Sequence, residues 1–147
     1  MSDLSILLDC ANGATYSVAP SVFSELGATV DTIGASPDGI NINQNCGSTS
    51  PDFLKEEIAE GDYDIGIAFD GDGDRILVVS SEGTVLDGDD ILYILSKDLS
   101  NESGVIGTLM TNKALELYFE EQGINFSRAD VGDKYVLNGT KMWITNA

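Results

Sequence analysis

The chain of 147 residues contains no histidine, and this absence restricts its chemistry more than any other feature of its composition. Histidine is the commonest general base in enzymes and the commonest protein ligand of transition metals. The sequence therefore excludes nucleophilic triads that are built on histidine, and it makes a transition-metal centre of the usual kind an unpromising interpretation.

Basic residues are scarce as well. Seven Lys and Arg residues stand against 25 Asp and Glu residues, which gives a formal net charge of −18. A field of this sign repels nucleic acids and anionic membranes, so we expect neither as a partner. It also repels a phosphosugar, and binding such a substrate would need Mg2+ together with basic groups from elsewhere.

Cysteines and long apolar runs are also few. Cys10 and Cys46 fit no metal-ligand spacing, and we expect buried or half-buried thiols; a disulfide between them is possible but unsupported. No apolar run approaches the roughly 20 residues that cross a bilayer. The first residues lack the basic stretch of a signal peptide. We therefore expect a soluble, cytoplasmic protein.

Hydrophobic residues make up 42% of the chain, which is enough to form the core of one domain or one and a half. Short apolar runs alternate with helical patterns, and this order predicts an α/β fold with a mixed, mainly parallel sheet and flanking helices. The expected strands are 5–9, 28–33, 64–69, 76–80 and 84–86, the last two as a hairpin, and the expected helices are 18–26, 51–61 and 89–99.

A polar segment at residues 101–104 marks the expected end of the first domain. Beyond it, two apolar runs flank a helical pattern and predict a partial second βαβ unit, with strands at 105–110 and 124–129 and a helix at 112–122. We expect three parts: a first domain over 1–104, this partial unit over 105–136 and a hairpin tail over 137–147.

The heptapeptide at residues 69–75 is the most informative stretch. It holds Asp70, Asp72 and Asp74, which are separated by single glycines and followed by Arg75. Three carboxylates that converge on one point repel one another unless a cation joins them, and oxygen ligands suit Mg2+ or Ca2+. The arginine can orient one carboxylate or hold an anionic group that arrives at the metal.

Two other interpretations of this heptapeptide stay open. An EF-hand also begins with Asp-x-Asp-x-Asp, but it needs glycine at its sixth position and glutamate at its twelfth, where this chain has Arg75 and Ser81. A solvated acidic turn is the second interpretation, because turns favour Asp and Gly in any acidic chain.

The heptapeptide resembles the metal-binding loop of the alpha-D-phosphohexomutases. This resemblance implies that Asp70, Asp72 and Asp74 bind Mg2+, and that Arg75 is the catalytic-site arginine beside a phosphoserine nucleophile. Three further segments are similar to the bacterial phosphoglucosamine mutase branch of the family: residues 8–14, 41–49 and 131–136. In the last of these, the resemblance leads us to expect arginine where Lys134 stands. The resemblance spans residues 4 to 136 and implies the second domain of the family plus the start of its third.

The resemblance also implies a reaction, the conversion of glucosamine 6-phosphate to glucosamine 1-phosphate by an intramolecular phosphotransferase, which is an isomerase. The family's phosphoserine lies in its first domain, and we expect neither that domain nor the substrate-binding domains in this chain. Phosphoryl transfer depends on positioning and charge neutralisation. We therefore expect weak Mg2+ affinity and no measurable turnover from the chain by itself.

Residues 137–147 depart from the family pattern. Asn138-Gly139 between alternating apolar residues predicts a hairpin, and these eleven residues resemble an acyl-CoA dehydrogenase segment that runs beside the flavin. We infer a chimera joined near residues 132–136, without FAD, because eleven residues cannot build a flavin pocket. The alternative function is a non-catalytic module that self-associates, as a homodimer, through its partial second unit.

Overall fold

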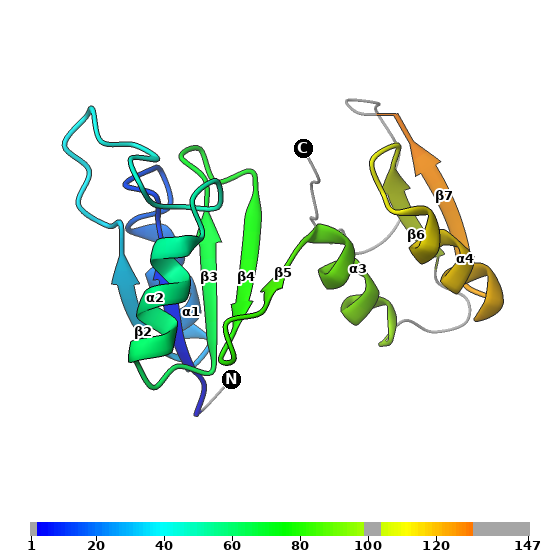
Figure 1. Ribbon diagram of the computed structural model, residues 1–147, viewed down its shortest axis with the longest axis horizontal. Helices are drawn as coiled ribbons and strands as arrows, with labels where there is room; N and C mark the ends of the chain where they lie inside the picture. The colour runs from blue at the N-terminus through cyan, green and yellow to red at the C-terminus, as the bar shows by residue number, and fades with distance from the viewer. Residues whose placement is uncertain (1–2, 99–103, 131–147) are drawn as a thin grey trace. The chain divides into compact units, whose positions relative to one another are not determined.

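A mixed five-stranded sheet forms the centre of the first part of the chain (Figure 1). The computed structural model describes residues 3–98 and 104–130. The chain divides into two units, one over residues 1–87 and the other from residue 88 onward. The strands of the first unit lie in the order β2-β1-β3-β4-β5 and have the bounds β1 (Ser5–Asp9), β2 (Thr29–Ile33), β3 (Ile65–Phe69), β4 (Ile76–Ser80) and β5 (Val85–Leu86).

Strand β1 lies between two parallel neighbours, β2 and β3. Beyond β3 the chain reverses direction, because β4 is antiparallel to β3 and β5 is antiparallel to β4. This topology confirms the expected mixed, mainly parallel sheet. Since parallel strands end at the same edge of a sheet, the segments that follow β1, β2 and β3 all leave from that edge.

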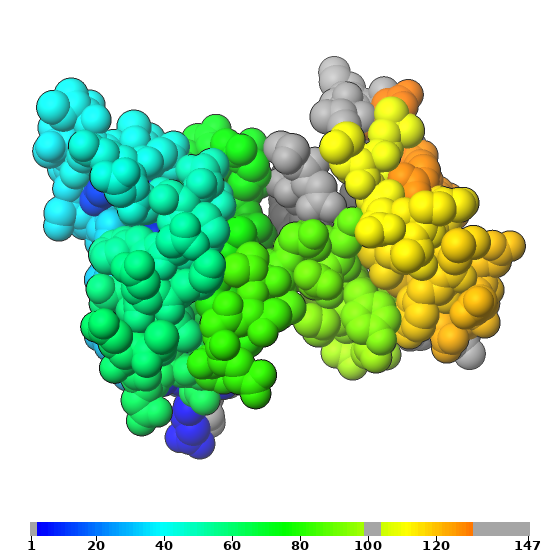
Figure 2. All heavy atoms as spheres, in the orientation of Figure 1, coloured from blue at the N-terminus to red at the C-terminus, as the bar shows by residue number. Residues whose placement is uncertain are grey.

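Two helices cover the two faces of this sheet (Figure 1). Side chains alternate along β1, so Ile6 and Leu8 pack with Ala19 of one helix, whereas Leu7 on the opposite face packs with Leu54 of the other. In Figure 2 the second helix and the segment before it cover the near face of the unit. The helices are α1 (Val18–Glu25) and α2 (Asp52–Glu60).

Within residues 88–98 and 104–130, the second unit contains a two-stranded parallel sheet and two helices. Its core consists of Val105, Leu115 and Phe119, and the ring of Phe119 stacks on that of Phe126 with centroids 5.5 Å apart. The expected βαβ unit is therefore present. Its elements are α3 (Gly88–Ser96), β6 (Gly104–Thr108), α4 (Lys113–Glu121) and β7 (Asn125–Ala129).

Helix α3 belongs to the second unit, and this differs from the boundary near residue 104 that the sequence suggested. The reason is packing: Leu92 and Tyr93 of α3 lie against the core of Val105, Leu115 and Phe119. The apolar periodicity of this helix predicts that one of its faces is buried, but it does not predict which unit covers that face.

The helices of both units are short, with eight residues in α1 and nine in each of the other three. Among the residues that the structure describes, no helix is long and apolar enough to cross a membrane. The expected hairpin at 137–147, the inferred joint at 132–136 and Lys134 lie outside the described residues.

Candidate metal centre

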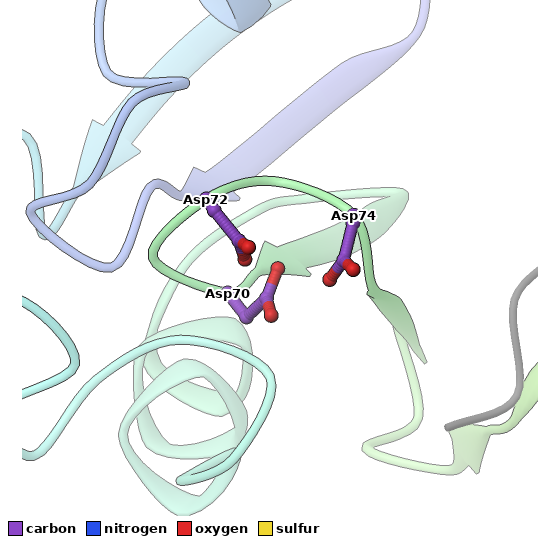
Figure 3. A group of neighbouring side chains, drawn as sticks. All are labelled: Asp70, Asp72 and Asp74. Atoms are coloured by element: carbon purple, nitrogen blue, oxygen red, sulfur yellow. The ribbon is translucent and has the colours of Figure 1, made fainter.

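The three aspartates of the heptapeptide converge in the loop between β3 and β4 (Figure 3). One carboxylate oxygen from each of Asp70, Asp72 and Asp74 lies within 4.8 Å of the others. Because the loop follows β3, which is parallel to β1, it lies at the carboxyl end of a parallel strand, where ligands bind in open α/β sheets. The EF-hand interpretation is wrong, because both flanks of the loop are strands that pair with each other, Phe69 opposite Ile76.

The backbone of the loop turns tightly around the Asp70 carboxylate. The N–H of Gly73 donates to the carbonyl of Asp70 at 3.1 Å, and the N–H of Arg75 donates to Oδ1 of Asp70 at 3.1 Å. Gly73 has a φ of +76°, and a Cβ at this position would lie 2.5 Å from Cγ2 of Thr15. Glycine is required here both for its backbone conformation and for the close approach of the neighbouring loop.

The three carboxylates differ in their surroundings. Asp70 is buried, with 1% of its side chain exposed, whereas Asp72 and Asp74 are more exposed. Burial raises the pKa of Asp70, but hydrogen bonds from the backbone and the guanidinium of Arg75 outweigh burial, and the pKa lies below its ordinary value. The pKa of Asp74 is raised by desolvation and by the charges of Asp72 and Asp70.

Arg75 connects two of the three carboxylates. Its Nε lies 2.7 Å from Oδ2 of Asp70 and 3.6 Å from Oδ1 of Asp74. The hydrogen bond and the charge of Asp70 raise the pKa of Arg75, so the guanidinium stays protonated. With 41% of its side chain exposed, Arg75 can pair with Asp70 and still present N–H donors to an incoming anion.

The donor set fits a hard divalent cation. All three candidate ligands are carboxylates, and such oxygens suit Mg2+, which keeps water or phosphate oxygens in its remaining positions. Zinc and copper sites are built mainly from His nitrogen and Cys sulfur, which these three residues do not supply. The pKa of Asp74 is raised first by desolvation and then by repulsion from Asp72 and Asp70, and a bound cation would relieve this repulsion.

Two neighbouring loops hold the aspartate loop by backbone contacts. The N–H of Ala14 donates to the carbonyl of Gly71 at 2.8 Å, and the N–H of Ser48 donates to the carbonyl of Phe69 at 2.8 Å. The chain at Gly13 passes so close that a Cβ there would overlap the carbonyl oxygen of Gly71. In the sequence, residues 8–14 and 41–49 could be singled out only by their family resemblance, because backbone contacts between distant loops leave no local pattern.

The cysteines lie in the same two loops, and both are buried free thiols, as expected. The side-chain amide of Asn12 donates to Sγ of Cys46 at 3.6 Å. Burial and the nearby charge of Asp9 raise the pKa of Cys10 to about 11, and the same two causes raise the pKa of Cys46. These thiols therefore stay protonated at neutral pH and act as packing residues.

The fold and the site agree with comparisons to known proteins. Residues 1–83 match the family model of phosphoglucomutase/phosphomannomutase, alpha/beta/alpha domain II, and residues 87–143 match domain III of the same family. The chain therefore belongs to the phosphoglucomutase/phosphomannomutase family. The domain III match begins next to α3, which agrees with the boundary that packing defines.

Within this family, the chain is similar to bacterial phosphoglucosamine mutases. It is 57% identical over 136 residues to the phosphoglucosamine mutase of Hahella chejuensis and 56% identical over 138 residues to that of Pseudomonas entomophila. These alignments cover 90% and 91% of the chain. The chain spans 31% of the length of each of these curated relatives.

Solved structures show the same architecture. A phosphoglucomutase/phosphomannomutase family protein from Burkholderia thailandensis superposes with a TM-score of 0.75 at 27% identity, and the match covers 88% of this chain and 30% of that one. A putative phosphomannomutase from Thermus thermophilus gives a TM-score of 0.71 at 17% identity, covering 88% and 32%, and supports the fold alone.

Proposed function

We propose that this chain provides the Mg2+-binding part of the catalytic site of a cytoplasmic phosphoglucosamine mutase, which converts glucosamine 6-phosphate to glucosamine 1-phosphate. The observation that carries the proposal is the convergence of three carboxylates within 4.8 Å beside an arginine, in a chain more than half identical to such enzymes. The network around Asp70 supports it, because a solvated acidic turn has no need of a buried, ion-paired carboxylate.

Each residue of the loop has a distinct task in this proposal. Asp70, Asp72 and Asp74 would hold Mg2+, which supplies charge neutralisation to a transferring phosphoryl group when it is bound. Arg75 orients Asp70 through Nε and offers its remaining donors to the phosphate oxygens. The net charge of −18 makes this local positive charge necessary for an anionic substrate.

A Mg2+ titration followed by melting temperature tests the metal site. A ligand at ten times its dissociation constant stabilises a protein by about 1.4 kcal/mol, which raises the melting temperature by a few degrees for a domain of this size. We expect this shift in the wild type and its loss in Asp72→Asn. Asp62→Asn, an exposed aspartate before β3, is the matched control and keeps the shift. A wild type that does not respond to Mg2+ contradicts the proposal.

An activity assay tests the mutase reaction. Because the chain spans 31% of the length of its relatives, the assay supplies the remaining mutase domains, with a phosphorylated serine, either in the same polypeptide or in trans. We expect conversion of glucosamine 6-phosphate that depends on Asp72, and little or none from the chain by itself. No conversion in any combination of domains would overturn the proposed reaction.

A second candidate function is self-association through the second unit. Five apolar side chains of this unit are 48–65% exposed: Ile94, Ile106, Leu109, Met110 and Leu117. We propose that a second copy of the chain covers them as a homodimer, since exposed apolar side chains favour association. Because the net charge opposes association, added salt should strengthen the dimer.

The mass in solution tests this second candidate. Sedimentation equilibrium at low and high salt should give twice the chain mass, and Ile106→Lys should shift the chain toward monomer. Thr84→Lys, an exposed position in the first unit, is the control for added charge and should leave the mass unchanged. A strictly monomeric mass at high protein concentration contradicts the homodimer.

A further inference from the structure

A fourth aspartate, outside the metal loop, lies fully buried at the end of β1. The carboxylate of Asp9 is 0% exposed and accepts two backbone hydrogen bonds. Its Oδ1 accepts from the N–H of Ala11 at 2.9 Å, and its Oδ2 accepts from the N–H of Gly47 at 2.6 Å. These two donors belong to different loops, one after β1 and the other between β2 and α2.

One glycine lies against this carboxylate, and a second glycine lies against the end of β3. A Cβ at Gly34 would lie 2.6 Å from Oδ1 of Asp9, and a Cβ at Gly47 would lie 2.7 Å from the carbonyl oxygen of Phe69. Both glycines have a positive φ, +56° and +81°. Gly34 therefore leaves room for the carboxylate of Asp9, and Gly47 lets its loop approach the end of β3 closely.

The two loops that Asp9 joins are the same two that hold the metal loop. The loop after β1 donates from Ala14 to the carbonyl of Gly71, and the loop after β2 donates from Ser48 to the carbonyl of Phe69. The loops are also joined to each other, since the N–H of Asn43 donates to the carbonyl of Ala11 at 2.8 Å. Asp9 therefore binds one residue in each of the two loops. One of these loops holds the carbonyl of Gly71, and the other holds the carbonyl of Phe69.

The backbone at this junction is held in an uncommon conformation. Ala11 and Asn12 have φ values of +53° and +47°, in the left-handed region that L residues seldom adopt. Such residues persist only where the surrounding structure fixes them. The hydrogen bond from Ala11 to Asp9 is one of the contacts that fix this turn.

We propose that Asp9 is a positioning residue of the metal centre, which sets the separation of the aspartate carboxylates by fixing the two loops that grip Phe69 and Gly71. This inference rests on the proposed Mg2+ function of the loop. Asp9 forms no ion pair with a cation among the described residues, so its charge is balanced by backbone N–H groups alone. Outer residues that orient ligands in this way typically change metal affinity 10- to 100-fold when they are replaced.

Burying a carboxylate at this position costs free energy of desolvation, and filling the space does not require a charged group. Burial raises the pKa of Asp9, although the hydrogen bonds from Gly47 and Ala11 oppose the shift. An apolar side chain of similar size would avoid the cost of desolvating a charge. It would also leave both N–H groups without an acceptor, and the two loops would lose their shared anchor.

The test compares Asp9→Asn with the same substitution at Asp64, which precedes β3 and lies beside the opposite end of β1. Oδ2 of Asp64 accepts from the N–H of Ser5 at 2.8 Å, so Asp64→Asn makes the same chemical change beside β1 but far from the metal loop. We expect Asp9→Asn to raise the Mg2+ dissociation constant about tenfold or more. The reason is that an amide accepts through one atom and turns an NH2 toward a backbone donor. Asp64→Asn should leave the constant unchanged.

The measurements separate positioning from a merely structural role. Calorimetric titration is done well below the melting temperature, where every variant is folded by circular dichroism, so a loss of stability alone does not change the dissociation constant. Mn2+ in place of Mg2+ gives an electron paramagnetic resonance spectrum that reports ligand geometry, and Asp9→Asn should alter this spectrum.

The outcomes are distinguishable. A wild type that binds neither Mg2+ nor Mn2+ overturns the proposed function, whereas equal affinity and equal spectra in wild type and Asp9→Asn overturn the role of Asp9. Where Asp9→Asn does not fold, Gly34→Ala replaces it, because its Cβ displaces the Asp9 carboxylate without removing it. Unchanged Mn2+ affinity in folded Gly34→Ala then overturns the inference.

Discussion

Oδ2 of Asp70 lies 2.7 Å from Nε of Arg75, so the most buried candidate ligand of the metal centre is already paired with a cation. The same carboxylate accepts from the backbone N–H of Arg75 through Oδ1 at 3.1 Å. A metal ion at this site would therefore share Asp70 with the arginine. This arrangement keeps Asp70 ionised and oriented, and it also places a positive charge next to the position of a bound cation.

We predict that Arg75→Met lowers the melting temperature of the metal-free protein and raises its Mg2+ affinity. The buried carboxylate of Asp70 loses its partner, which destabilises the fold. Removal of the nearby positive charge lowers the repulsion of a divalent cation and raises the Mg2+ affinity about three-fold. Calorimetric titration and thermal melting give both quantities. Arg75→Lys keeps the charge and should bind Mg2+ as the wild type does; weaker binding in both variants would contradict the prediction.

We predict that Gly13→Ala weakens Mg2+ binding, because its Cβ would overlap the carbonyl oxygen of Gly71. Overpacking of this kind costs about 1–3 kcal/mol of stability, and here the strain falls on the metal loop. The control is Gly39→Ala, which has a φ of +93° but no atom within 4 Å of the new Cβ. That variant should lose stability through backbone strain alone, and its Mg2+ dissociation constant should not change.

We predict that the ion pairs of Glu116 contribute their full stability above about pH 4.5 and lose it progressively as the pH falls below that value. Hydrogen bonds from Lys113 and Arg128, at 2.8 Å each, lower the pKa of Glu116 from its ordinary value of 4.5. A carboxylate with a lowered pKa stabilises the folded state above the unfolded value, and this contribution is lost as the pH falls. Urea unfolding should show wild type more stable than Glu116→Gln at pH 7, with the difference smaller at pH 3. Glu121→Gln, exposed at the end of the same helix, should show no such difference.

We predict that the two thiols react slowly with Ellman's reagent until the protein unfolds. Cys10 has a pKa of about 11, so about one molecule in a thousand carries the thiolate at pH 8, and burial further restricts access. Two equivalents should react in denaturant. Cys10→Ser, which leaves only Cys46, should give one equivalent in denaturant and the same slow rate when folded. Rapid reaction of the folded wild type would contradict the buried position of both sulfurs.

Local pattern in the sequence was sufficient to predict the strands and helices of the residues that the structure describes. The strand expected at 5–9 is β1, and the expected hairpin is the pair β4 and β5. These predictions held because apolar runs, turn glycines and helix-starting residues act over a few positions. The boundary at 104 was misplaced for the opposite reason, since the side of α3 that becomes buried depends on the core around Phe119.

The candidate metal centre also has residues that the sequence could predict and one that it could not. Asp70, Asp72 and Asp74 could be named from the sequence as candidate ligands because they and the arginine lie within six consecutive residues. Asp9 could not be named as their support, because it is 61 positions before Asp70 and acts through loops that meet only when β1 and β3 pair. Its hydrogen bonds to Ala11 and Gly47 leave no spacing that a sequence pattern can reveal.

By itself, the sequence determined the order of strands and helices, the family resemblance and the three candidate metal ligands, since each of these depends on neighbours along the chain. Only the tertiary structure decided that α3 packs with the second unit and that Asp9 joins the two loops around Phe69 and Gly71. The physical reason is that burial and backbone hydrogen bonds between distant segments depend on which strands pair, and pairing places residues far apart in the chain a few ångströms from each other.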